Sequence, residues 1–166
     1  MSDPVPMTLV GVRIELPTET PILLLRESAG RRYLPIWIGE HEATAIVVAL
    51  EGIESPRPLT HDLLKSVTGA LDAEVNRVVV TELNEGTFFA DLVLTRNGEE
   101  VTVSARPSDA MALAARTEAA VFAERALLDE VGVELQDDDE DEEEIERFKE
   151  FLEEISPDDF FSGENG

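Results

Sequence analysis

The hydrophobic and polar positions of the first fifty residues predict three strands followed by a helix. Residues 8–16 alternate apolar and polar side chains, and 22–28 and 32–38 are further apolar runs separated by short turns. Residues 40–50 carry apolar side chains at helical spacing, and Gly52 follows as a stop. Strands joined by short turns are most simply antiparallel neighbours, so this segment predicts a β-β-β-α unit.

The same pattern recurs 67 residues later, where residues 75–118 align with residues 8–51. Asn97-Gly98 stands at the second hairpin and favours a type I′ turn. Glu42 aligns with Asp109, so each copy has an acid at its helix start. The repeat predicts an α+β fold, a duplicated β-β-β-α unit with a mainly antiparallel sheet packed against helices. The alternative is that any three strands and a helix share such a pattern.

Further helices are expected around these units. Thr60 is the expected N-cap of a helix over residues 61–71, with its apolar side chains turned inward: Leu63, Leu64, Val67 and Leu71. Ser108 is the expected N-cap of a helix over 109–117, with Pro107 at the first helical position as the alternative. A last helix is expected over 119–131, ending at Gly132.

Charge divides the chain into two regions, residues 1–133 and residues 134–166. The second holds sixteen acids against two bases, a net of −14, and includes an unbroken acidic run at 137–144. An amphipathic helical stripe follows at 145–155. This acidic tail could mimic nucleic acid, cover a basic patch or recruit a protein partner. The alternative is a solubilising terminus.

Composition limits the possible functions. There is no cysteine, which excludes disulfides and thiolate chemistry. No apolar run of eighteen residues and no secretory leader is present, which favours a cytoplasmic protein that does not span a membrane. Residues 1–133 carry 21 acids, 11 bases and a single lysine, Lys65. That balance lacks the basic footprint of a general nucleic-acid binder.

Two histidines stand beside carboxylates at expected helix starts, in Glu40-His41-Glu42 and in His61-Asp62. If the two starts meet, they would form an oxygen-rich site suited to Mg²⁺ or Mn²⁺. The alternative is that these acids only stabilise the first turns of their helices.

Arg57 and Arg106 each precede a proline just before a helix start. Arginine at such a place suits a phosphate or carboxylate ligand. An internal ion pair to Asp62, Asp109 or Glu42 explains the same residues.

Three segments in order resemble the bifunctional nuclease domain family of bacteria and plants: LPIWIGEHEATAI (34–46), RPLTHDLL (57–64) and RPSDAMALAAR (106–116). The resemblance covers about residues 7–133 and implies a compact, oligomer-forming α+β fold, with a dimer favoured, and nuclease activity on DNA and RNA. The motif positions in this chain are Gly39, Glu42, Ala43, Arg57, Pro58, Thr60, His61, Asp62, Arg106, Ser108, Asp109 and Ala110.

Two hypotheses follow. The first is a Mg²⁺- or Mn²⁺-dependent nuclease whose catalytic and metal-binding residues are Glu42, His61, Asp62 and Asp109, with Arg57 and Arg106 on the substrate phosphate. The second is a non-catalytic, homo-oligomeric binding or regulatory module, which the acidity and the scarcity of lysine favour.

Overall fold

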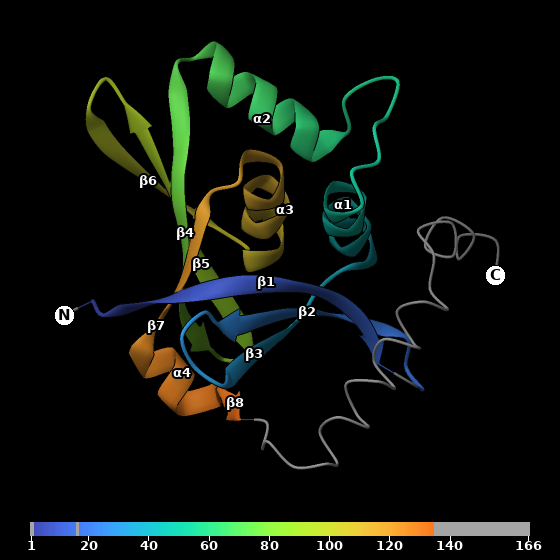
Figure 1. Cartoon of the computed structure of the whole chain (residues 1–166), viewed down its shortest axis with the longest axis vertical. Helices are drawn as coiled ribbons and strands as arrows, with labels where there is room; N and C mark the ends of the chain where they lie inside the picture. The colour runs from blue at the N-terminus through green and yellow to red at the C-terminus, as the bar shows by residue number, and fades with distance from the viewer. Residues whose placement is uncertain (1, 16, 135–166) are drawn as a thin grey trace.

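A computed structural model describes residues 2–15 and 17–134, and these form an α+β structure with one large sheet (Figure 1). The strands in this part are β1 (Pro4–Glu15), β2 (Thr20–Glu27), β3 (Arg32–Trp37), β4 (Ala73–Asn84), β5 (Thr87–Arg96), β6 (Glu99–Ala105), β7 (Ala120–Glu124) and β8 (Val133–Glu134). The helices are α1 (Glu40–Leu50), α2 (Thr60–Ala70), α3 (Pro107–Thr117) and α4 (Arg125–Val131). The acidic run and the amphipathic stripe of the tail lie outside the described residues.

The sheet has eight strands in the order β6-β5-β4-β7-β1-β2-β3-β8 across the described residues. Every pairing is antiparallel except that of β4 with β7, which is parallel. The sheet therefore consists of two antiparallel three-stranded sets, β1-β2-β3 and β4-β5-β6, with β7 between them and the short β8 beside β3. The prediction of a mainly antiparallel sheet packed against helices is confirmed.

The element order β-β-β-α occurs twice, as β1-β2-β3-α1 and as β4-β5-β6-α3. Helix α3 begins and ends 67 residues after α1, and β5 and β6 begin 67 residues after β2 and β3. The hairpin at Asn97-Gly98 has φ of 53° and 77° at its two central residues, as a type I′ turn requires.

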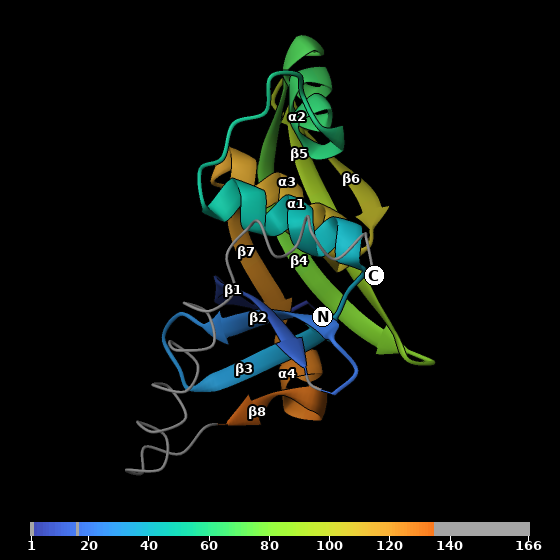
Figure 2. The ribbon, with the colours of Figure 1, turned by 90° about the vertical axis from the view of Figure 1, so that its right-hand side faces the viewer.

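Helices α1 and α3 lie side by side against the sheet, and α2 lies across one end of the molecule (Figures 1 and 2). Helix α3 is buried along most of its length because small residues let its neighbours approach closely; Ala110, Ala112 and Ala114 are all nearly inaccessible. Aliphatic side chains of β2 and β3, such as Leu23, Leu25 and Leu34, complete the same core.

The prediction of a helix over 119–131 is wrong in its first half. Residues 120–124 form β7, in which buried side chains alternate at Val121 and Ala123, and only Arg125–Val131 is helical. The alanine-rich sequence favours a helix locally, but pairing with β1 on one side and β4 on the other supplies hydrogen bonds to both strand edges.

The two expected N-caps are also wrong. Helix α2 already includes Thr60, and the carboxylate of Asp62 accepts the hydrogen bond from the Leu59 backbone N–H at 3.0 Å. Helix α3 starts at Pro107 after an extended Arg106, so the alternative start is the correct one.

The inward orientation expected for the apolar residues of α2 is wrong as well. Leu63, Leu64, Val67 and Leu71 are all exposed, by 38 to 54%. The side of α2 that faces the protein carries His61 and Asp62 instead, because these side chains have polar partners on α3.

None of the helices within residues 2–15 and 17–134 is both long and apolar enough to span a membrane.

Candidate functional site

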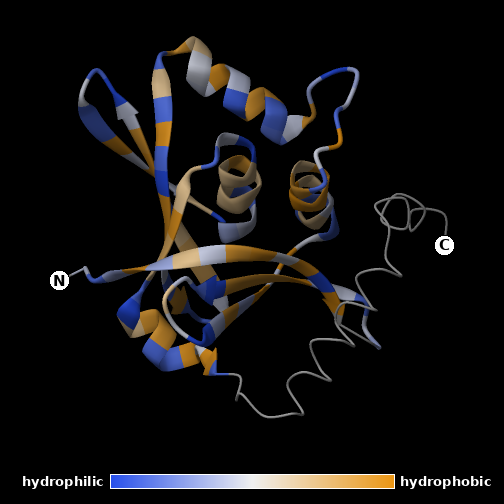
Figure 3. Ribbon diagram, viewed as in Figure 1, coloured by the Kyte–Doolittle hydropathy of each residue, from blue (hydrophilic) through white to orange (hydrophobic). Residues whose placement is uncertain are grey.

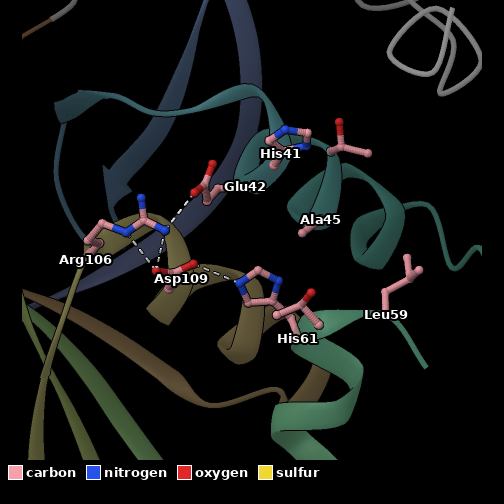
Figure 4. A pocket seen from close by; sticks show the side chains of 9 residues that line it. His41, Glu42, Ala45, Leu59, His61, Arg106 and Asp109 are labelled. Carbon is pink, nitrogen blue, oxygen red and sulfur yellow. Dashed lines mark hydrogen bonds and ion pairs between the residues drawn. The ribbon is translucent and has the colours of Figure 1, made fainter. Parts of the chain in front are cut away.

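Three helix N-termini, those of α1, α2 and α3, meet at one pocket of about 300 Å³ (Figure 4). The lining residues are His41, Glu42, Thr44 and Ala45 of α1, Leu59, Thr60 and His61 at the start of α2, and Arg106 and Asp109 at the start of α3. Helix N-termini present unpaired backbone N–H groups and the positive ends of their dipoles. Such a pocket favours a negatively charged ligand.

His61 and Asp109 form a hydrogen-bonded pair at the base of this pocket. The Nε2 atom of His61 lies 2.9 Å from Oδ1 of Asp109, and the histidine side chain is only 11% exposed. An ionised carboxylate only accepts hydrogen bonds, so Nε2 carries the proton in this pair and Nδ1 is left as the acceptor of the neutral ring. The carboxylate thereby fixes both the tautomer and the orientation of the imidazole.

Arg106 joins the acids of the two repeated units. Its Nε donates to Oδ2 of Asp109 at 2.8 Å, and its Nη2 donates to Oε1 of Glu42 at 2.7 Å. The hydrogen bonds that Arg106 donates to Asp109 and then to Glu42 raise the pKa of its guanidinium further, so this group stays charged. The ion-pair interpretation of Arg106 is therefore observed, while its side chain remains 65% exposed at the pocket mouth.

Asp62 does not line the pocket, unlike Glu42, His61 and Asp109. Its Oδ1 accepts from Nε of Arg116 at 2.6 Å, and its Oδ2 accepts from the Leu59 backbone. The hydrogen bond from Arg116 is the main cause of a lowered Asp62 pKa, which keeps this carboxylate ionised. Asp62 therefore holds the start of α2 against α3, and this fixes the backbone that carries the neighbouring His61.

Arg57 is exposed in the loop between α1 and α2 and does not line the pocket. The structure thus places one of the two expected substrate-binding arginines in the pocket. The other remains a prediction.

The expected metal ligands do not gather as a set. Within residues 2–15 and 17–134, no group of three or more histidines and acids is placed to hold a metal ion. Glu42 and Asp109 face each other across Arg106, and His61 is bonded to Asp109. The donor groups as arranged therefore do not fit Mg²⁺ or Mn²⁺, and the dependence on either ion stays a prediction.

Sequence reasoning missed Arg116, the residue that anchors Asp62. Its side chain is 6% exposed, and its Nη1 donates to the carbonyls of Ala45 and Ala112 at 3.0 and 2.8 Å. One guanidinium thus contacts α1, α2 and α3. A basic residue in the last turn of a helix is ordinary, so the sequence held no signal beyond its place in RPSDAMALAAR.

The part of the chain that builds the pocket is similar to known proteins. A model of the bifunctional nuclease domain matches residues 23–136. An uncharacterized protein of Mycobacterium tuberculosis is 47% identical over 159 residues, which cover 92% of this chain and 95% of that protein. Bifunctional nuclease 1 of Oryza sativa subsp. japonica is 28% identical over 109 residues, 64% of this chain and 33% of the rice protein. Bifunctional nuclease 2 of Arabidopsis thaliana is 30% identical over 107 residues, 61% of this chain and 32% of the plant protein.

Proposed function

This chain belongs to the bifunctional nuclease domain family, and we propose that it hydrolyses phosphodiester bonds of DNA and RNA in the pocket between α1, α2 and α3. The observation that carries the proposal is the arrangement of His61, Asp109 and Arg106. A histidine oriented by a carboxylate can move a proton, and an exposed arginine beside it can bind the phosphate whose ester is cut. The names of the plant relatives, which match over about a third of their own length, support the same activity.

In this proposal Arg106 and the helix N-termini hold the phosphate. The Nε and Nη2 atoms of Arg106 are bonded to Asp109 and Glu42, while its Nη1 makes no hydrogen bond to the described residues. Nη1 can therefore donate to a phosphate oxygen without breaking the contacts that fix the guanidinium. Glu42 and Asp109 hold Arg106 in a single position, which lowers the entropy cost of binding.

His61 then acts as the general base. Its Nδ1 accepts a proton from a water molecule as the water oxygen attacks phosphorus. The bond from phosphorus to the leaving ester oxygen breaks, and that oxygen takes a proton from solvent. Asp109 stabilises the imidazolium that forms, through the hydrogen bond to Nε2. Proton transfer of this kind contributes about 10² to 10⁴ in rate.

Electrostatics restrict how such a chain would hold its substrate. The net charge is −24, so long-range attraction to a polyanion is absent. Arg106 and the three helix N-termini form a local site for one phosphate group. Binding should therefore be weak and only slightly dependent on salt, because few counterions are displaced.

A second function is a non-catalytic module that binds a small anion or a protein. The observation favouring it is that Arg106 is already balanced by two carboxylates, each within 2.8 Å. An arginine held in this way can act as a structural cross-link between α1 and α3 without taking part in chemistry.

Cleavage of labelled single-stranded RNA and DNA oligonucleotides by the full chain separates these functions. The wild type should cut both substrates, and His61→Gln or Asp109→Asn should each reduce the rate by about 10² to 10⁴. Glu40→Gln is the matched control, because Glu40 lies in the same turn as Glu42 but does not line the pocket. Reactions with Mg²⁺, with Mn²⁺ and with EDTA test the predicted metal dependence independently.

Two results would decide against catalysis in this pocket. One is cleavage that persists unchanged in both His61→Gln and Asp109→Asn. The other is no cleavage by the wild type under any condition, together with phosphate binding that Arg106→Gln abolishes in calorimetry. That second result would establish the binding module.

A further inference from the structure

Strands β2 and β3 have a second face, directed away from the core. Leu23 and Leu25 of β2 stand opposite Ile36 and Leu34 of β3, and all four share one core with Ile46 of α1. The residues between them point to the other side of the sheet, because successive side chains of a strand alternate. We call this side the outer face, and its residues on the two strands are Ile22, Leu24, Arg26, Tyr33, Pro35 and Trp37.

The outer face is apolar over most of its length. The strand register places Ile22 opposite Trp37 and Leu24 opposite Pro35. Trp37 is 55% exposed, and the other three side chains are partly buried. Val133 extends the face onto β8, where it is 48% exposed. A large aromatic ring and several aliphatic side chains therefore form one apolar surface.

The sequence of β2 and β3 indicates that this surface is covered. Residues 22–25 read ILLL and residues 34–38 read LPIWI. Figure 3 shows hydrophobic residues following one another along β2. A strand with one face in water normally alternates apolar and polar residues, whereas a continuous apolar run is typical of a strand covered on both faces. Helices cover one face of β2 and β3, so a second cover is expected on the outer face.

We propose that the amphipathic stripe at residues 145–155 of this chain packs on the outer face as a helix. A helix of eleven residues is about 16 Å long, and the six residues of β3 extend over about 20 Å, so the two lengths match. At helical spacing the apolar side chains of the stripe lie on one side. They are Ile145, Phe148, Phe151, Leu152 and Ile155.

The path of the chain favours this segment as the occupant. Strand β8 is paired with β3, so the chain leaves β8 beside the outer face. Ile145 lies eleven residues after Glu134, a stretch that spans up to about 36 Å when extended. From β8 to β1 the sheet is three strand spacings wide, about 14 Å. The amphipathic stripe can therefore reach every part of the outer face.

Charge also favours this segment. The chain has a net charge of −24, yet residues 8–38 hold four arginines against three glutamates, a net of +1. Arg13 of β1 and Arg26 of β2 lie at opposite ends of the outer face by their strand register. The amphipathic stripe follows the acidic run at 137–144 and contains Glu153-Glu154. Acids beside the stripe can thus approach arginines beside the outer face.

Helix α2 offers another apolar surface, but it suits the amphipathic stripe less well. Leu63 and Leu71 of α2 are 53 and 54% exposed. Strand β8, from which the tail continues, lies at the opposite end of the molecule from α2 (Figures 1 and 2). The one base of α2, Lys65, is balanced by Asp62 in the same helix. Neither the chain path nor charge therefore directs the tail to α2.

Fluorescence of Trp37, the single tryptophan of the chain, tests this docking in the full chain. Phe148→Ser with Phe151→Ser removes the two aromatic anchors of the stripe. The emission should then shift to longer wavelength, and acrylamide quenching should increase at least about twofold as the indole becomes accessible to water. Phe160→Ser with Phe161→Ser is the matched control, because it removes two phenylalanines of the same tail outside the stripe. The control should leave both values unchanged.

Nuclear magnetic resonance separates the chain's own stripe from that of a second copy. The chain has no native cysteine, so Glu150→Cys takes a single spin label on the helix side away from the apolar residues. In a ¹⁵N-labelled chain this label should broaden the indole N–H signal of Trp37. A ¹⁵N-labelled wild type mixed with a spin-labelled chain without ¹⁵N should keep a sharp signal.

The proposal is overturned if Phe148→Ser with Phe151→Ser leaves the emission and quenching of Trp37 as in the wild type, or changes them no more than the control does. An indole signal unaffected by the label at position 150 would also overturn it. Broadening in the mixed sample would show that a second copy supplies the stripe, and the proposal fails in that case as well. These measurements require no cleavage assay, so their outcome is independent of the proposed function.

Discussion

Replacement of Arg116 by methionine tests how α2 is held in place. The guanidinium is 6% exposed and makes three hydrogen bonds, to Asp62, Ala45 and Ala112. Methionine keeps the long apolar stem and removes the charge and all three bonds. Helix α2 then loses one of the two side-chain ion pairs that join it to α3 among the described residues.

The expected decrease in the free energy of unfolding follows from the burial of the two ion-pair partners. Breaking a fully buried ion pair costs about 3–5 kcal/mol because the remaining charge has no partner. Asp62 is 35% exposed and keeps its bond to the Leu59 backbone, so water recovers part of that cost. Nη2 of Arg116 is buried without a hydrogen-bond partner, so its removal stabilises the folded state by about 1 kcal/mol. The balance is a destabilisation of about 2 kcal/mol.

Urea unfolding and thermal melting measure this change. For a folded part of roughly 130 residues, 2 kcal/mol corresponds to a Tm decrease of about 7 °C. Arg96→Met is the control, since Arg96 is exposed at a hairpin end, and it should change stability by less than about 0.5 kcal/mol. A double-mutant cycle with Asp62→Asn should give a coupling energy above about 1 kcal/mol. An Arg116→Met variant as stable as the Arg96→Met control would refute the account of how α2 is docked.

Other predictions follow from the same contacts. The lowered pKa of Asp62 contributes stability above the unfolded carboxyl pKa near 3.9 and loses it as pH falls through the lower folded value. The stability difference between wild type and Asp62→Asn should therefore be constant above about pH 5 and shrink below about pH 4 in urea titrations. Gly39→Ala would place a Cβ against one carboxylate oxygen of Glu42, so this side chain, whose other oxygen accepts from Arg106, must shift. It should weaken phosphate binding in calorimetry while the Tm changes little, and a binding constant equal to wild type would contradict this. Gly69→Ala meets open space inside α2, so it should stabilise the chain by up to about 1 kcal/mol in urea unfolding; destabilisation would show that the α2 backbone is differently placed.

The sequence predicts most of the fold because the two repeated units follow local rules. The alternation in β2 and β3, the Asn97-Gly98 hairpin and the span of α1 are readable from neighbouring residues. The regular alternation expected over residues 8–16 is broken in β1 by a register shift between Leu9 and Gly11, which leaves Val10 exposed. Strand β7 cannot be read from its own residues, because its alanines favour a helix. Only the hydrogen bonds to the edges of β1 and β4 make this segment a strand. Those edges come from positions far apart in the chain.

The apolar residues of α2 show the same limit. Helical spacing shows which residues share a face, but it does not show which face is turned inward. The inward side is decided by Arg116 and Asp109, which lie 54 and 48 residues from their partners. An assumption that apolar means buried therefore placed Leu63 and Val67 on the wrong side.

For the site, the sequence predicts one set of six residues: Glu42, His61, Asp62, Asp109, Arg57 and Arg106. The structure brings Glu42, His61, Asp109 and Arg106 to one pocket, whereas Asp62 and Arg57 do not line it. The sequence left two interpretations of these acids open, because a carboxylate at a helix start suits an arginine as well as a metal ion, and the structure shows the pairing with Arg106. Two neighbouring residues of α2 have separate partners on α3. His61 bonds to Asp109 in the pocket, while Asp62 bonds to Arg116 outside it.

The most direct test of the proposed chemistry is rescue of His61→Ala by imidazole. If His61 transfers the proton, the variant should lose about 10² to 10⁴ in cleavage rate, and added imidazole should restore at least about tenfold by entering the vacated space. Asp109→Asn retains its imidazole and should gain nothing. A His61→Ala variant that cleaves at the wild-type rate would contradict the account, as would equal acceleration of both variants by imidazole.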